Sequence, residues 1–197
     1  MKTLALEMST AKGSIALRDD GTPLFDATFA ADRKHSGAFF ENVERCMQRF
    51  GRPDRIVVGL GPGSYAGVRI AIATALGLRS ASEARLAGIP SICALEVADA
   101  AYGVVGDARR QSFFFARVED GRVTEGPVLE SETELQERLK SFCEPVYSSE
   151  PLAQFPSLKI AYPAAGRLAA LVCEIDDAQT LEPIYLREPH ITIPKPI

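Results

Sequence analysis

The feature that most constrains the fold is a glycine turn between two apolar segments, "IVVGLGPGSYAGVRIAIATALGL", at residues 56–78. The segment before the turn, residues 55–60, is a continuous apolar run, which is typical of a strand buried on both faces of its sheet. The segment after the turn, residues 65–82, predicts a helix. The fold must therefore cover this strand from both sides.

The glycine turn either binds a phosphate or only starts the helix. Gly61, Gly63 and Ala66 fit the relaxed dinucleotide pattern G-x-G-x-x-G/A between a strand and a helix. However, the acidic residue that this pattern needs comes before the next strand begins, Pro62 has no N–H to donate, and no Lys-Ser/Thr pair follows. We therefore expect Ser64 to cap the helix. For ligand binding we then expect only a weak anion or nucleotide contact, at Gly61, Gly63 and Ser64.

The helix at residues 65–82 is apolar around nearly its whole circumference, so it must be covered on all sides. Either the later part of the chain covers its outer side, or a partner protein does. The amphipathic helix predicted at residues 37–51, with Ser36 as its N-cap, adds large apolar groups beside it. The partner surface that we predict consists of Phe39, Phe40, Val43, Met47, Val68, Arg69, Ile72 and Leu76.

The order of elements indicates a mixed α/β fold. Residues 3–8, 14–21 and 23–30 read as three strands joined by short turns, which is an antiparallel meander. A further strand is expected at residues 88–95, after the second helix. Three strands followed by helix, strand, helix and strand exclude a simple doubly wound sheet.

The sequence changes in texture after Ala101, and we expect two lobes, residues 1–101 and a smaller lobe at residues 102–197. The smaller lobe contains a hairpin around Asp120-Gly121 and a helix at residues 132–142. An alanine-rich helix follows at residues 164–175.

Charge and composition exclude several classes of protein. The net charge of -4 is spread along the chain, without the basic stripe that direct binding of nucleic acid needs. No apolar run reaches the roughly 20 residues of a membrane span, and the first residues turn polar too early for a signal peptide. We therefore expect a cytoplasmic protein without a membrane segment.

Neither the cysteines nor the histidines are spaced as metal ligands. The four cysteines are far apart, Cys143 and Cys173 being the nearest pair, and His35 and His190 lie in different parts of the chain. No G-x-S-x-G elbow is present either. We expect no metal site, no cofactor and no catalytic residue.

Several segments resemble the bacterial TsaB (YeaZ-like) family, which acts in the synthesis of threonylcarbamoyladenosine in tRNA. They are "LALEMSTAKGSIAL", "RKHS", "VVGLGPGSYAGVRIAIATALGL", "DARRQSFFFA" and "PIYLREP". The resemblance implies an actin/Hsp70/sugar-kinase-like fold of two ribonuclease-H-like lobes, the second one small. In this family an aspartate is usual where this chain has Glu7, and a threonine where it has Ala66, which argues against nucleotide chemistry here.

The resemblance also implies a function. A TsaB-like chain is a non-catalytic subunit that dimerises with a TsaD-like catalytic subunit through a helix bundle, is joined by a TsaE-like ATPase, and meets tRNA only indirectly. The helices matching residues 36–50 and 65–79 would form the bundle. Two alternatives stay open: a small actin-like ATPase or kinase with nucleotide in its own cleft, and a self-associating homodimer.

Overall fold

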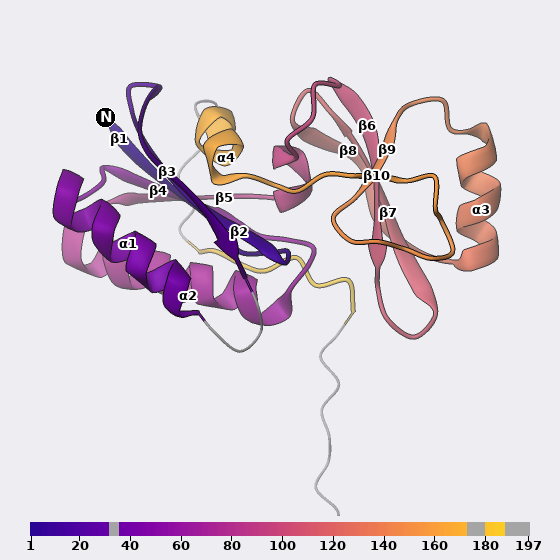
Figure 1. Ribbon diagram of the computed structural model, residues 1–197, viewed down its shortest axis with the longest axis horizontal. Helices are drawn as coiled ribbons and strands as arrows, with labels where there is room; N and C mark the ends of the chain where they lie inside the picture. Colours follow the sequence, from indigo (N-terminus) through magenta and orange to yellow (C-terminus); the bar gives the residue numbers. More distant parts are fainter. Residues whose placement is uncertain (32–35, 173–179, 188–197) are drawn as a thin grey trace, which may run out of the picture.

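The computed structural model describes residues 1–31, 36–172 and 180–187. The described residues form two five-stranded sheets, one toward each end of the long axis (Figure 1). Both sheets combine antiparallel and parallel pairs, which confirms the predicted α/β class. Three residues named above lie outside the described residues: His35, Cys173 and His190.

The first sheet has the strand order β3-β2-β1-β4-β5. Strands β1, β2 and β3 pair antiparallel and form the predicted meander, while β4 and β5 extend the sheet in parallel. The glycine turn therefore follows a strand with a neighbour on each side, as its apolar sequence predicts. The bounds are Lys2–Glu7 for β1, Lys12–Asp19 for β2, Thr22–Ala30 for β3, Arg55–Gly59 for β4 and Arg85–Ile89 for β5.

Helices cover both faces of the first sheet (Figure 1). Helices α1 (Gly37–Phe50) and α2 (Tyr65–Ser82) lie on one face, and α4 (Ala165–Leu171) lies on the other. Because successive residues of a strand point to opposite faces, Leu4 packs into the core under α1 and α2, whereas Ala5 packs into the core with α4. Helix α4 thus returns to the first sheet although it follows residue 101.

Two local predictions are wrong. The strand expected at residues 88–95 ends at Ile89, and a short 3-10 helix, η1 (Ser91–Ala94), follows it. Pro90 has no N–H for the ladder, and the Ser91 N–H donates to the Gly61 carbonyl instead. Ser36 makes no side-chain cap, because its backbone is not extended, with φ of -79° and ψ of 3°.

The second sheet has the strand order β10-β9-β6-β7-β8. Strands β6, β7 and β8 form an antiparallel meander that contains the predicted hairpin, and β9 and β10 add in parallel. Helix α3 (Glu132–Ser141) packs on β7 and β8 and begins with a capping box from Ser131 and Glu134. The bounds are Ala101–Asp107 for β6, Ser112–Glu119 for β7, Arg122–Ser131 for β8, Val146–Ser148 for β9 and Lys159–Ile160 for β10.

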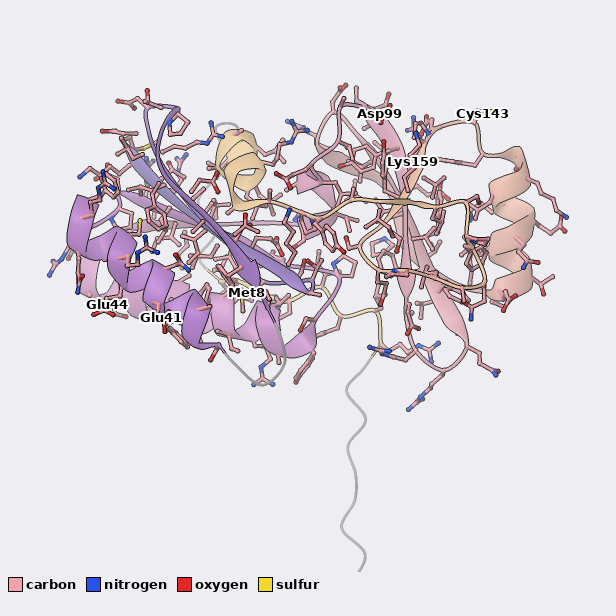
Figure 2. All side chains as sticks on the ribbon, in the orientation of Figure 1. Met8, Glu41, Glu44, Asp99, Cys143 and Lys159 are labelled. Atoms are coloured by element: carbon pink, nitrogen blue, oxygen red, sulfur yellow. The ribbon has the colours of Figure 1, made fainter. Side chains whose placement is uncertain are left out.

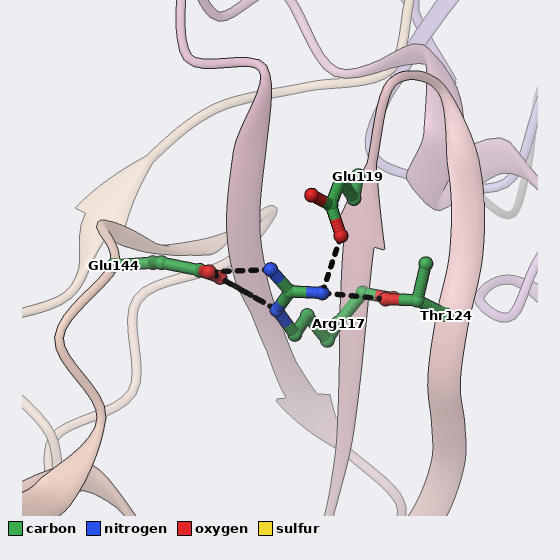
Figure 3. Close-up of polar contacts among 4 residues, drawn as sticks. All are labelled: Arg117, Glu119, Thr124 and Glu144. Atoms are coloured by element: carbon green, nitrogen blue, oxygen red, sulfur yellow. Dashed lines mark hydrogen bonds and ion pairs between the residues drawn. The ribbon is translucent and has the colours of Figure 1, made fainter.

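Polar side chains fasten the second sheet to the loop after α3 (Figure 3). The Arg117 guanidinium lies 2.5 Å from Glu144 and 2.7 Å from Glu119, and it donates to Thr124 Oγ1 at 3.1 Å. Asp99, in the link between the two sheets, accepts a short hydrogen bond from the Tyr147 hydroxyl of β9. These contacts connect β7 and β8 to the loop after α3, and the link between the two sheets to β9.

The position of α4 bears on the predicted lobes. This helix packs against β1, β2 and β4, so part of the chain after residue 101 belongs to the core of the first sheet. The division into residues 1–101 and 102–197 stays a prediction. No helix in the described part of the chain has both the length and the apolar character needed to cross a membrane.

Candidate functional site

A cleft of about 780 Å³ lies between the two sheets. Its first wall is the carboxyl end of the first sheet, at residues 9–11, 60, 62–66, 91, 92 and 95. Its second wall is residues 104–109, in β6 and the turn after it, and residues 183–187 also line the cleft. Ligands of open α/β sheets commonly bind at such carboxyl ends, so this cleft is where the glycine turn would act on a ligand.

Two backbone N–H groups of the glycine turn donate hydrogen bonds to other residues of the chain. The Gly61 N–H donates to Ser91 Oγ at 3.0 Å, and the Ser64 N–H donates to the Ser9 carbonyl at 2.6 Å. A Cβ atom at Gly63 would overlap the same Ser9 carbonyl, so close packing of two turns requires this glycine. The weak anion contact at Gly61, Gly63 and Ser64 stays a prediction. The N–H groups of Gly61 and Ser64 already donate within the chain, so fewer donors are left for an anion.

The role predicted for Ser64 is confirmed. Its backbone is extended, and its side chain accepts a hydrogen bond from the Gly67 N–H at 3.3 Å, which caps α2. The turn therefore starts α2. Capping of this helix explains the sequence of the turn without a bound phosphate.

Glu7, at the end of β1, is fully buried and is not among the residues that line the cleft. Its Oε1 accepts a hydrogen bond from the Ser9 N–H at 2.6 Å, while Oε2 has no hydrogen-bond partner among the described residues. Burial raises the pKa of the Glu7 carboxyl, and hydrogen bonds from Ser9 oppose the shift. A carboxyl held below the cleft and biased toward its neutral form is poorly placed to ligate a nucleotide's metal ion.

The predicted partner surface divides into buried and exposed members. Four of its side chains belong to the chain's own core and cannot touch a partner while the helices keep these positions: Phe39, Val43, Val68 and Ile72. On α1, Met47 is half-buried and Phe40 is 48% exposed. On α2, Arg69 is exposed and Leu76 is 42% exposed. The prediction of a partner surface therefore rests on these last four residues.

The outer side of α2 stays open among the described residues. Ala73, Leu76 and Gly77 are exposed there, and a Cβ atom at Gly77 would meet no atom within 4 Å. Glu41 and Glu44 lie on the outer side of α1 and point away from the sheet (Figure 2). Among the residues that the structure describes after Ala101, none covers the exposed side chains of Ala73 and Leu76.

Sequence reasoning missed a cluster at the amino end of α2. The rings of Tyr65 and Tyr185 pack against each other with centroids 5.2 Å apart and planes tilted by 30°, and the Tyr65 hydroxyl accepts a hydrogen bond from Arg69 Nη1 at 2.6 Å. Tyr185 belongs to the late motif "PIYLREP", whose aromatic and arginine residues were the available signal.

A long segment that includes the glycine turn matches a known protein family. The model described as TsaD, tRNA N6-adenosine threonylcarbamoyltransferase, matches residues 29–133, more than half of the chain. The chain belongs to this family. Within it the chain is TsaB-like: it is 32% identical over 97 residues to the Escherichia coli tRNA threonylcarbamoyladenosine biosynthesis protein TsaB, covering 47% of this chain and 41% of that protein.

Other relatives carry no assigned activity. An uncharacterized protein of Mycobacterium tuberculosis and one of Mycobacterium bovis are each 31% identical over 142 residues. The alignments cover 69% of this chain and 65% of each relative, so this TsaB-like chain spans slightly less than two thirds of their length.

Solved structures confirm the fold. YeaZ from Pseudomonas aeruginosa superposes with a TM-score of 0.71 at 22% identity, covering 94% of this chain and 99% of that one. The ethanolamine utilization protein EutJ from Carboxydothermus hydrogenoformans reaches a TM-score of 0.50 at 13% identity, covering 87% and 90%. The TsaB-like chain therefore shares the fold of these two proteins, which confirms the actin/Hsp70/sugar-kinase-like fold that the resemblance implies.

Proposed function

We propose that this chain is a non-catalytic scaffold and activator subunit in the biosynthesis of threonylcarbamoyladenosine in tRNA. It dimerises through α1 and α2 with a TsaD-like catalytic subunit, and a TsaE-like ATPase joins the pair. Membership of the threonylcarbamoyltransferase family and similarity to a TsaB protein support this role.

The observation that carries the proposal is the open outer side of α2. Exposed apolar and small residues, Ala73, Leu76 and Gly77, allow another helix to approach the backbone closely. Phe40, on the neighbouring helix of the same face, supplies a large apolar group of the kind enriched in interfaces. A helix pair docking on this face would bury an interface of about 1,600 Å² if it were of standard size.

Two features of the cleft support a non-catalytic role. The glycine turn donates the N–H groups of Gly61 and Ser64 to the chain itself. Glu7, the residue at the position where catalytic members of the superfamily place an aspartate, is buried away from the cleft. Gly61, Ser64 and Glu7 thus make contacts within the chain in place of contacts with a ligand.

The test is to mix the purified chain with the TsaD-like protein of the same organism and to measure mass by light scattering. We expect a heterodimer, and we expect Phe40→Asp and Leu76→Asp to abolish it. Leu129→Asp is the matched control, because Leu129 is 41% exposed on β8, in the other sheet. Loss of association in the control, or none in the two variants, would contradict the proposed interface.

The same experiments separate the alternatives. A chain that has twice its monomer mass alone, and that ignores the TsaD-like protein, would be the self-associating homodimer. Micromolar binding of ATP to the isolated chain in calorimetry, together with ATP hydrolysis that Glu7→Ala abolishes, would indicate the small ATPase or kinase.

A further inference from the structure

Two connections between the sheets lie side by side. Residues 90–100 lead from β5 into β6, and residues 161–164 lead from β10 to α4. Leu95 of the first connection and Pro163 of the second form an antiparallel bridge, and both line the cleft. Leu95 is also buried in the core that α4 shares with both sheets. The two connections therefore form one joint, packed into this core at one side of the cleft.

A third segment, residues 181–187, spans the two sheets at a different place, and we call it the strap. Figure 1 draws it in yellow, apart from the two paired connections and below them. Residues 183–187 of the strap line the cleft, as Leu95 and Pro163 of the joint do. The joint thus bounds the cleft on one side, and the strap bounds it on another.

The strap is fastened to the first sheet and its helices at three points. Leu181 is buried in the core under α1 and α2. The Ile184 N–H donates to the Leu60 carbonyl at 2.9 Å, directly before the glycine turn. The Tyr185 ring packs against Tyr65 of α2. An apolar, a backbone and an aromatic contact must all break before this end of the strap can leave.

The other end of the strap meets the second sheet through more exposed groups. Arg187 Nη2 donates to Ser112 Oγ at 2.7 Å, at the start of β7. Arg187 is exposed and Ser112 is half-buried, so water can replace either partner when this bond breaks. Leu186 is half-buried against the core that holds the joint. The strap therefore releases the second sheet more easily than the first.

We propose that the strap is a latch on the cleft. While Arg187 is bonded to Ser112, the second sheet is held at its present distance from the first. When this bond breaks, the second sheet turns about the joint and the cleft widens, while Leu181 keeps the strap on the first sheet. The contacts nearest the joint change least in such a turn. The chain then has two forms, and a molecule that binds one form better shifts the balance toward it.

The test measures a distance across the cleft by double electron–electron resonance. One spin label is attached to Cys143, which is exposed after α3, and the other to Ala73→Cys, on the exposed side of α2. Cys173→Ser removes another thiol, and Cys46 and Cys93 are buried, so they should stay unlabelled. The full chain labelled in this way should show one dominant distance, that of the closed form.

Arg187→Ala and Ser112→Ala each remove one partner of the bond. In each variant a second distance should grow, and the ratio of open to closed molecules should rise by about 2- to 10-fold, as expected for the loss of one hydrogen bond. The double variant should show the same ratio as either single variant, because both changes remove the same bond. Additive effects would overturn the proposal, since the two side chains would then act separately.

Hydrogen exchange distinguishes a latch from a segment that detaches altogether. The Ile184 amide, which is bonded to the Leu60 carbonyl, should stay as protected in Arg187→Ala as in the wild type. Faster exchange at Ile184 in this variant would mean that the strap leaves the first sheet as well. A latch needs a fixed end, so that result would contradict the proposal.

Lys140→Ala is the matched control. Lys140 lies on α3, its side chain is 68% exposed, and it pairs with Glu137 at 2.6 Å, so this variant also removes one cation and one polar contact. It should leave the distances unchanged, and circular dichroism checks that each variant folds. A strap variant that unfolds at lower temperature with unchanged distances would show that the bond only stabilises the fold. That result, or a wild type with as many open molecules as the variants, would overturn the latch.

Discussion

The carboxyl of Glu7 occupies the space that a side chain at residue 59 would need, so Glu7 and Gly59 are matched across neighbouring strands. A Cβ atom at residue 59 would overlap Glu7 Oε2 and would also lie 2.6 Å from Ser91 Oγ. Strands β1 and β4 are parallel neighbours, and both positions are buried, so neither side can yield toward solvent. Glycine is required at residue 59 for this reason.

Gly59→Ala should therefore destabilise the chain. Overpacking of a buried site costs about 1–3 kcal/mol, and we expect the upper part of that range because the neighbours are buried polar atoms. Urea unfolding followed by circular dichroism measures the change. Gly77→Ala is the matched control, because residue 77 is exposed in α2 with open space around it. It should stabilise the chain by about 0.5–1 kcal/mol, the helical cost of glycine relative to alanine.

Stability should depend on pH through Glu7. Burial raises the pKa of this carboxyl in the folded chain above the unfolded value of 4.5. The folded chain therefore holds the proton more tightly, so the contribution of Glu7 is most favourable below pH 4.5 and is lost as the pH rises through the folded pKa. Glu7→Gln has no charge to bury. As the pH rises, the free energy of unfolding of this variant should therefore increase relative to that of the wild type. A constant difference across that range would contradict this cause.

Leu168→Ala should weaken the first sheet, although residue 168 lies in the second half of the chain. The Leu168 side chain is fully buried in the core that α4 shares with Ala5, Ala16 and Val57 of the first sheet. Truncating a buried leucine to alanine costs about 2–5 kcal/mol. Native-state hydrogen exchange should show faster opening of β1 and β2. Faster opening confined to β6–β8 would instead favour independent lobes divided at residue 101.

Two residues one helical turn apart on α2 should respond differently to a charge. Ile72 is 7% exposed and Leu76 is 42% exposed. Ile72→Asp would bury an unpaired carboxylate and should unfold the chain or cost more than about 4 kcal/mol. Leu76→Asp should stay within about 0.5 kcal/mol of the wild type, because surface substitutions rarely do more. Thermal unfolding of both variants checks this difference, which also decides whether Leu76→Asp is a clean probe of association.

Elements whose formation depends on local pattern follow from the sequence. The meander, the helices α1 and α2, the hairpin around Asp120-Gly121 and the cap at Ser64 all match their predicted places. The strand expected at residues 88–95 does not, because β4 ends at Gly59 and leaves nothing to pair with beyond Ile89. Its apolar residues are buried in a 3-10 helix, and burial alone does not distinguish the two conformations.

The sequence by itself determined the order of strands and helices and the apolar faces of α1 and α2, because hydrophobic period and turn residues act over a few neighbouring positions. Only the tertiary structure decided which of those apolar residues stay exposed. Phe39 and Phe40 are adjacent and chemically identical, yet one is in the core and the other is half in solvent. Likewise, only folding brings Tyr65 against Tyr185, since that contact depends on how residues 183–187 pack along the cleft and not on any local pattern.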